Sequence, residues 1–245
     1  MLSEHVRNSS MQGRAATAGS ALVVLALAVI WSARSTVNRS LYVSELGADG
    51  EPTAGWFAFA LFLLVVGAAS IAWAGRDIRS TAPLLRRWTP SASLGIAAAF
   101  FYLASRVPCT SGCPLPLGDT FTLQDLVHTL AAVLAFAMAC VAMLQASCAV
   151  GFPRLRRMSL GAAISVALIA STGGMLSLLR FGTDIGGMLE LVATTIAIAW
   201  LAVYGGSIAR SRLPHGASPG PDTSARRPIE SPHVPALGVQ AGRQR

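Results

Sequence analysis

Charge is scarce in this chain of 245 residues. Only 12% of the residues are charged, whereas 53% are hydrophobic, and the mean hydropathy is +0.56. A soluble domain usually carries roughly twice that charged fraction. The composition therefore excludes a soluble enzyme, a nucleic-acid-binding domain and a disordered chain as the main interpretation.

Lysine is absent, so all 19 basic residues are arginine. Together with the richness in alanine, this is typical of a GC-rich bacterial genome. The formal net charge of +8 would suit nucleic acid, but the arginines are scattered over short loops instead of being gathered on one face. We therefore expect membrane lipids as partners and no nucleic acid. The sequence identifies no protein partner.

Long apolar stretches are what the chain does have. A helix needs roughly 20 apolar residues to cross about 30 Å of hydrocarbon, and a spanning segment of this kind must be helical because the bilayer offers backbone groups no other partner. We expect an all-α, polytopic transmembrane helix bundle, and the third span is only just long enough. The six predicted spans are 15–33, 54–74, 89–105, 126–150, 160–179 and 186–208.

The arginines predict the orientation of these spans. Fifteen lie in the N-terminus, the second and fourth loops and the C-terminal segment, whereas the alternate loops hold four: Arg34, Arg39, Arg106 and Arg180. The positive-inside rule places both termini in the cytoplasm and loops one, three and five outside a bacterial plasma membrane. The chain then divides into a cytoplasmic N-terminus (1–14), a six-helix transmembrane domain (15–209) and a disordered cytoplasmic tail (210–245) rich in proline.

The first span also resembles a secretory signal peptide. It follows a basic N-terminus and contains Ala26-Leu27-Ala28, a sequence of the kind that signal peptidase cleaves. Because the apolar run continues through Trp31, we interpret it as a retained span. Loop one is expected to lie outside whether this span is retained or cleaved.

Cysteine is rare, with four residues in all. Cys109 and Cys113 lie in loop three, where an oxidising exterior favours a small disulfide ring over a pair of free thiols or a metal site. Gly112 suits the tight turn that such a ring requires. Cys140 and Cys148 lie within the fourth span and are interpreted as small hydrophobic residues.

Two ionisable side chains, His128 and Glu190, fall just inside the outer ends of predicted spans. Such groups are costly in a bilayer and are functional candidates by default, although the polar interface is within their reach. Asp125 precedes His128 by three residues, so it can either orient the imidazole or cap the helix. Asp184 can cap the last span in the same way. Gly186 and Gly187 are interpreted as a surface for helix contacts.

Several polar residues are predicted to gather at this outer face. They can bind an anionic headgroup or another charged ligand, or they can join the loops by salt bridges. Below the interface Glu190 needs a partner, and we expect Arg106 or Arg34, since guanidinium pairs well with carboxylate. The candidate ligand-binding residues are Ser44, Glu45, Arg106, Asp125, His128 and Glu190.

Three segments together resemble a known family. They are Tyr42–Ala48, which contains Ser-Glu-Leu-Gly, the Cys109–Cys113 pair, and Asp125-x-x-His128 with Ala131, Ala132 and Phe136 after it. In this order they resemble the bacterial and archaeal membrane family catalogued as domain of unknown function 998. The resemblance covers roughly residues 15–210 and implies about six spans, but it implies no reaction. The family often has arginine after a Gly-x-x-Glu element, whereas here Leu191 follows Glu190.

The scarcity of histidine excludes several chemistries. Of four histidines only His128 lies within a predicted span, so neither a bis-histidine haem nor a multi-histidine zinc site can be assembled. The chain has no phosphate-binding loop and no dinucleotide fingerprint. We therefore expect no metal and no cofactor.

Three functional classes remain. The leading hypothesis is a non-enzymatic envelope protein that binds a lipid headgroup or a partner at a polar outer pocket. A membrane-embedded serine-type hydrolase would use Asp125 and His128 with Ser44 or Ser105 as nucleophile, although no nucleophile elbow is present. A transporter of a small polar solute is the third, and against it polar residues gather on one side only.

Overall fold

The structure is a computed structural model that describes residues 2–81, 88–114, 118–149, 153–179 and 181–213. These residues form helices and loops, and the only β-type pairing among them is an isolated bridge between Ser80 and Ala149. The predicted all-α class is therefore confirmed. The elements are α1 (Leu2–Ser35), the short 3₁₀ helix η1 (Ser44–Gly47), α2 (Ala54–Ala74), α3 (Pro90–Arg106), α4 (Leu123–Ser147), α5 (Pro153–Leu178) and α6 (Thr183–Arg212).

Five of these helices, α1, α2, α4, α5 and α6, are long and apolar enough to cross a membrane. The remaining one, α3, has 17 residues, which at 1.5 Å per residue gives about 25 Å. That is somewhat less than the roughly 30 Å of a hydrocarbon core. Large apolar side chains such as Trp56, Phe62 and Leu168 lie exposed on the outside of the bundle. A surface of this kind suits lipid contact, so the chain is a membrane helix bundle.

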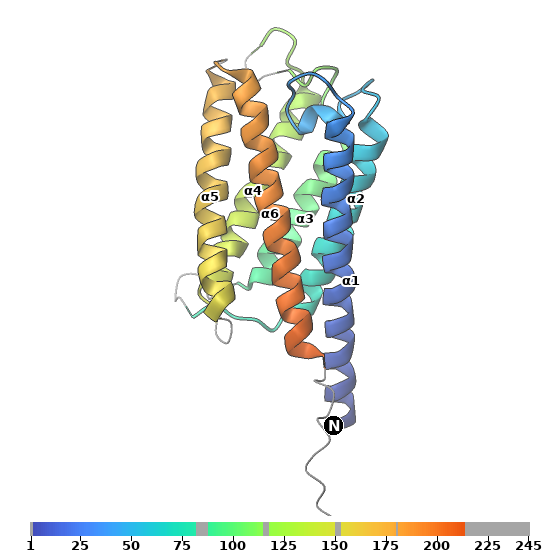
Figure 1. Ribbon diagram of the computed structural model, residues 1–245, viewed down its shortest axis with the longest axis vertical. Coiled ribbons are helices and arrows are strands. Elements are labelled where there is room, and N and C mark those ends of the chain that lie inside the picture. Colours follow the sequence, from blue (N-terminus) through green and yellow to red (C-terminus); the bar gives the residue numbers. More distant parts are fainter. Residues whose placement is uncertain (1, 82–87, 115–117, 150–152, 180, 214–245) are drawn as a thin grey trace, which may run out of the picture. The chain divides into compact units, whose positions relative to one another are not determined.

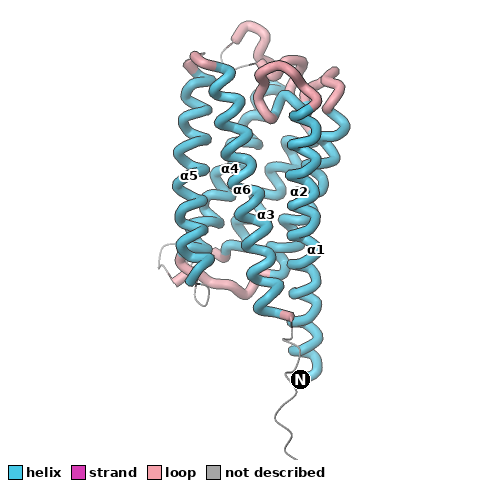
Figure 2. The backbone as a smooth tube through the Cα atoms, viewed as in Figure 1, coloured by secondary structure: helices cyan, strands magenta, loops and turns pink. Residues whose placement is uncertain are grey.

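The six helices form a ring that follows the order of the sequence. Each helix packs against the next one, and α6 closes the ring by packing against α1 (Figures 1 and 2). Gly19 of α1 and Gly67 of α2 lie opposite each other, and a Cβ atom on either one would come within 2.8 Å of the other's carbonyl oxygen. Small residues therefore allow close approach in this ring, as is common between membrane helices.

The described helices extend beyond the predicted apolar stretches. α1 already begins at Leu2, α5 begins at Pro153, and α6 continues to Arg212, so the predicted tail boundary at 210 falls inside a helix. Apolar runs mark only the part of a helix that a bilayer would cover, whereas the helix continues as long as its polar turns reach water. Of the predicted tail, residues 214–245 lie outside the described part of the chain.

Local sequence explains where α3 and α4 begin. Thr89 accepts a hydrogen bond from the amide of Ala92, and Pro90 follows it at the first helical position. Thr122 and Asp125 form a reciprocal capping box at the start of α4. Asp184 does not take the capping role considered for it, since Gly182 precedes α6 in a left-handed conformation and no side chain caps this helix.

Candidate functional site

The centre of the ring holds a cavity. Its walls come from α1, α2, α3, α4, α6 and η1, with no described residue of α5 among them. The cavity offers about 80 Å³ to the centre of a water-sized sphere, and a single water needs roughly 10–15 Å³ on that measure. Its wall runs along α4 from His128 to Met143 and along α6 from Glu190 to Leu201, that is, over roughly 16–22 Å of helix.

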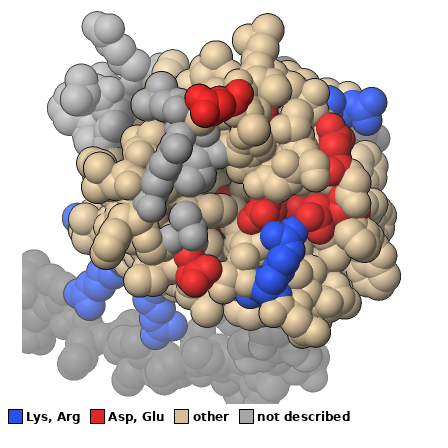
Figure 3. Space-filling view, turned by 90° about the horizontal axis from the view of Figure 1, so that it is seen from above, with Lys and Arg blue, Asp and Glu red and all other residues tan. Residues whose placement is uncertain are grey.

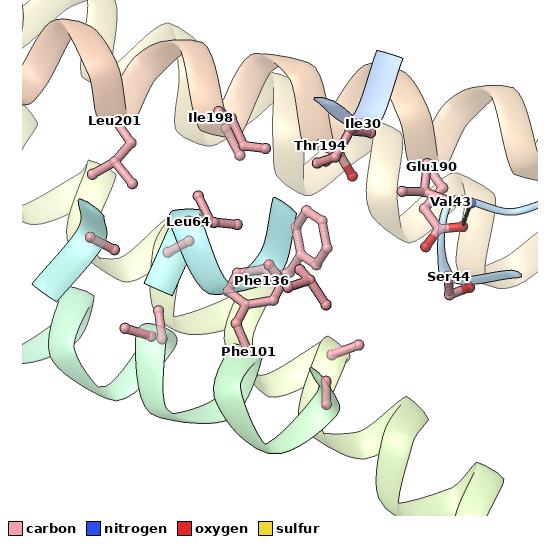
Figure 4. A pocket seen from close by; sticks show the side chains of 18 of the residues that line it. Ile30, Val43, Ser44, Leu64, Phe101, Phe136, Glu190, Thr194, Ile198 and Leu201 are labelled. Carbon is pink, nitrogen blue, oxygen red and sulfur yellow. Dashed lines mark hydrogen bonds between the residues drawn. The ribbon is translucent and has the colours of Figure 1, made fainter. Parts of the chain in front are cut away.

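Most of this wall is apolar. The rings of Phe101 and Phe136 lie against each other in its middle, with centroids 5.6 Å apart, and Leu64 and Ile198 lie near them (Figure 4). Leu201 lies farther along, and Trp200 also lines the cavity while its indole nitrogen donates to the Ser159 hydroxyl at 2.8 Å. These apolar residues cannot be recognised from the sequence as cavity residues, because an apolar wall and ordinary helix packing use the same residue types.

Four polar residues complete the lining: Ser44, His128, Glu190 and Thr194. Ser44 lies in η1, His128 in the first turns of α4, and Glu190 and Thr194 in the early turns of α6. These segments meet where η1 lies, and we call this the η1 end of the bundle (Figure 1). The cavity is therefore amphipathic, with a polar η1 end and a long apolar remainder.

Glu190 connects α6 to the segment that leads into η1. Its Oε2 atom accepts a hydrogen bond from the backbone amide of Val43 at 2.9 Å (Figure 4). The amide and hydroxyl of Ser44 also donate toward this carboxyl group. The expectation that Arg106 or Arg34 pairs with Glu190 is wrong. Among the described residues the salt bridges involve other acids, and Arg34 donates to the carbonyl of Val37 instead.

Two glycines make room for the same segment. A Cβ atom on Gly187 would collide with the carbonyl oxygen of Leu41, and one on Gly186 would lie 2.7 Å from the hydroxyl oxygen of Tyr42. These glycines therefore receive a loop. Gly186 also lies in a helix contact, as interpreted from the sequence, because a Cβ atom on Gly173 of α5 would lie 3.5 Å from its carbonyl oxygen. Glu190 lies one turn after Gly187, so the Gly-x-x-Glu element fixes residues 41–44 on α6.

The Ser-Glu-Leu-Gly segment can now be understood residue by residue. Ser44 lines the cavity, and Glu45 accepts from the amide of Tyr42 at 3.0 Å and pairs with Arg39 at 3.1 Å. Arg39 also pairs with Glu51, and the hydrogen bond that it donates to Glu45 is the main cause that raises the pKa of this guanidinium above its usual value. Leu46 is fully buried, and a Cβ atom on Gly47 would collide with the ring of Phe57. The segment therefore forms one folded cover over the cavity.

Asp125 holds the loop that contains the disulfide. Its carboxylate accepts from the amide of Thr110 at 2.7 Å and from the hydroxyl of Thr122 at 2.7 Å, and it is buried. The predicted Cys109–Cys113 disulfide is present, and Gly112 adopts a positive φ in the turn between the two cysteines. The loop also meets the segment that follows η1, since the carbonyl of Cys109 accepts from the amide of Asp49 at 3.0 Å.

His128 is held by the end of α3. Its Nδ1 atom lies 2.9 Å from the carbonyl oxygen of Val107 and 3.1 Å from that of Ala104. Because carbonyl oxygens only accept hydrogen bonds, Nδ1 carries the proton, and a neutral ring then offers Nε2 as an acceptor. Asp125 and His128 do not bond to each other in the described structure, so the helix-capping alternative for Asp125 is the one that the structure shows.

A ring nitrogen of His128 and the sulfur atoms of Cys109 and Cys113 lie within 4.8 Å of one another. Three such atoms can hold a soft metal ion when the sulfurs are thiolates. Here the two sulfurs are bonded to each other, so they do not offer a thiolate pair. With the two cysteines oxidised to a disulfide, these residues therefore do not fit a metal ion.

The remaining predicted residues lie apart from the cavity. Ser105 donates to the carbonyl of Tyr102 at 2.6 Å, and it does not line the cavity. Arg106 ends α3 and is also missing from the cavity lining among the described residues. Sequence reasoning missed a second buried polar cluster, in which Gln145 bonds the hydroxyl of Ser93 at 2.7 Å and the carbonyl of Trp88 at 3.0 Å.

The η1 end is acidic as a whole. The segments predicted to lie at the outer face contain four arginines and seven acidic residues, which gives a formal charge of −3, while the whole chain carries +8. Figure 3 shows the acidic side chains spread over this face. Such a charge attracts cations and repels anions.

Comparison with known proteins identifies a family. No curated protein and no solved structure matches the chain. The family described as "protein of unknown function (DUF998)" matches residues 15–207, which include η1, the disulfide loop and nearly all of α6. Because this match covers most of the chain, the chain belongs to this family.

Proposed function

We propose that this integral membrane protein binds an amphiphilic molecule with a single apolar chain in the central cavity. The observation that carries the proposal is the cavity's division into a long apolar part and a polar end formed by Ser44, His128 and Glu190. Burial of apolar surface there contributes about 25 cal/mol per Å², while the polar groups give the molecule one orientation. This proposal is a form of the hypothesis that the protein binds a lipid at a polar outer pocket. The apolar chain of the ligand would lie inside the ring, and its headgroup would lie at the η1 end.

The proposal includes the orientation in the membrane. Six helices would cross or nearly cross the bilayer with both termini in the cytoplasm, and the η1 end would lie outside. The distribution of arginines supports this arrangement, since only four of 19 belong to the outer segments. A cavity polar at its outer end would then accept a molecule whose head is near the outer interface.

The hydrolase alternative has less support. A triad needs a carboxylate on the histidine and a nucleophile beside it, whereas His128 bonds to two carbonyl groups and Asp125 bonds to threonines. Ser44 lines the same cavity as His128, yet it donates toward Glu190. The transporter alternative is also weaker, because Phe101 and Phe136 make the middle of the cavity apolar.

The test fills the cavity without changing its polar end. Ala98 is buried and lines the cavity, while its neighbour Ala99 is exposed on the outside of the same helix. We expect Ala98→Phe to lose at least tenfold of the single-chain lipid that co-purifies with the protein, measured by mass spectrometry after gentle detergent extraction. Ala99→Phe should retain it.

Ala139 and Ala137 provide a second matched pair on α4, in case Ala98→Phe does not fold. Retention in a monodisperse gel-filtration peak shows which variants are folded. Equal lipid content in wild type and in a folded cavity variant would contradict the proposal.

A further inference from the structure

The polar end of the cavity holds a carboxyl group with which no cation pairs among the described residues. Glu190 is half-buried and lines the cavity. Its hydrogen-bond donors are the amide of Val43 and the amide and hydroxyl of Ser44, none of which carries a positive charge. A carboxylate has about four acceptor sites, so these donors leave it able to accept once more. A carboxyl group withdrawn from water is either neutral or paired with a cation, so a cationic ligand stabilises its charged form.

No arginine of the described residues pairs with Glu190, and the exposed Arg106 does not line the cavity. Arg39 is committed to Glu45 and Glu51, and Arg34 to a backbone carbonyl. His128 is the one basic side chain in the lining, and its Nδ1 proton is already donated to the end of α3. Its Nε2 atom is therefore a second acceptor at the same end of the cavity.

These groups select the head of the bound molecule. Two acceptors, one of them a carboxylate, match a head that donates hydrogen bonds and carries a positive charge. A carboxylate or phosphate head would face Glu190 without any arginine to compensate it, and the acidic η1 end would repel it before entry. This differs from the anionic headgroup considered from the sequence for the polar residues gathered at the outer face.

We propose that the cavity takes a single-chain amphiphile with an ammonium head, which pairs with Glu190 and can donate a further hydrogen bond to Nε2 of His128. This inference rests on the proposed function, because it assumes that an apolar chain occupies the cavity. It adds the chemical class of the head, so the inference about the head can fail while the proposed function still stands.

Three probes with the same saturated chain test the head: hexadecylamine, hexadecanol and hexadecanoic acid. The assay is a competition in which each probe is titrated against a bound fluorescent polyene chain. It uses the full-length protein in nanodiscs made of zwitterionic lipid at neutral pH. We expect the amine to displace the probe at a concentration at least tenfold lower than the acid, with the alcohol between them. This comparison uses the wild-type protein and does not depend on the folding of any variant.

Glu190→Gln removes the charge while its amide oxygen can still accept from Val43. We expect this variant to bind the amine about tenfold more weakly and the alcohol as before. Asp184→Asn removes an exposed acid near the start of the same helix and should leave the order unchanged.

The outcomes separate the two proposals. Displacement by all three probes with the acid as strong as the amine would overturn the inference and leave the proposed function standing. An equal loss of amine binding in Asp184→Asn would also overturn it, because surface charge would then explain the preference. Failure of every probe to bind would contradict the proposed function itself.

Discussion

Glu190 of α6 accepts a hydrogen bond at 2.9 Å from the backbone amide of Val43, a residue 147 positions earlier in the chain. This contact fixes the covering segment of the cavity on the last helix of the ring. The same carboxylate borders the cavity. One residue therefore joins the structure of the cover to the chemistry of the proposed binding site.

The structural part of this role can be tested by changing Glu190 to leucine. The apolar side chain leaves the buried amide of Val43 without an acceptor, and an unsatisfied buried polar group costs about 1–3 kcal/mol. We expect a loss of that size in the free energy of unfolding in mixed micelles. Asp49→Leu is the loop control, since Asp49 accepts only from Gln124 at an exposed site. Equal stability of the two variants would show that the Val43 contact is dispensable.

Gly187 provides a second test of the covering segment. A methyl group there collides with the backbone of Leu41, which cannot turn away as a side chain would. We expect Gly187→Ala to lower the unfolding free energy by about 1–3 kcal/mol, as overpacking usually does. Gly174 lies in α5 with no atom near its Cβ position, so Gly174→Ala should be neutral or slightly stabilising. Thermal denaturation in detergent measures both, and a neutral Gly187→Ala would contradict this packing.

The sequence predicted the helices well and their partners less well. Apolar runs locate helices because the bilayer requires about 20 apolar residues, and α2 agrees with its predicted span. The disulfide also follows from local spacing. The partner of Glu190 could not be predicted, because Val43 contributes a backbone amide and any residue type has one. Its neighbour Gly187 became informative only after the loop at Leu41 was seen against it.

The cavity was also beyond the reach of sequence reasoning. Ser44, His128 and Glu190 were predicted to share one face, and the structure brings these three to one cavity. Glu45, Arg106 and Asp125 do not line it, because Glu45 pairs with Arg39 and Asp125 binds Thr110. Alanines such as Ala98 and Ala139 can either fill a core or border a cavity. The packing of the whole ring decides between the two, and the local sequence pattern does not reveal it.

Asp77 predicts a dependence of stability on pH at the opposite end of the bundle. The side chain of Gln12 donates to it at 3.0 Å and is the main cause that lowers its pKa below the ordinary 3.8, with Arg212 and Arg76 adding to the effect. A lowered pKa in the folded state stabilises the fold at neutral pH, and this contribution is lost as the pH falls through that pKa. Because Asp77 is more than half exposed, we expect at most about 1 kcal/mol.

Unfolding of wild type and Asp77→Asn should therefore differ slightly at pH 7 and converge as the pH falls below the lowered pKa of Asp77 in the folded protein. Asp49→Asn, at the other end of the bundle, serves as the control. A difference between wild type and Asp77→Asn that persists unchanged at the acidic pH would show that charge is not the cause.

Orientation in the membrane can be measured with reporter fusions. We expect a reporter after Arg157 or Arg210 to behave as cytoplasmic and one at Asp49 as external, since arginines gather in the segments assigned to the cytoplasm. External behaviour at Arg157 would reverse the proposed topology and would place the η1 end inside.

The quenching of Trp200 tests the central claim that a single apolar chain enters the ring. Trp200 is 3% exposed and lines the cavity, whereas the other four tryptophans are 44–60% exposed on the outside. In a protein with those four changed to phenylalanine, we predict that a brominated single-chain amine quenches Trp200 saturably. Brominated two-chain phospholipids of the surrounding bilayer should leave it bright, and Ala98→Phe should abolish the quenching by the amine. Quenching of Trp200 by the bilayer lipids, or none by the single-chain amine, would contradict the account.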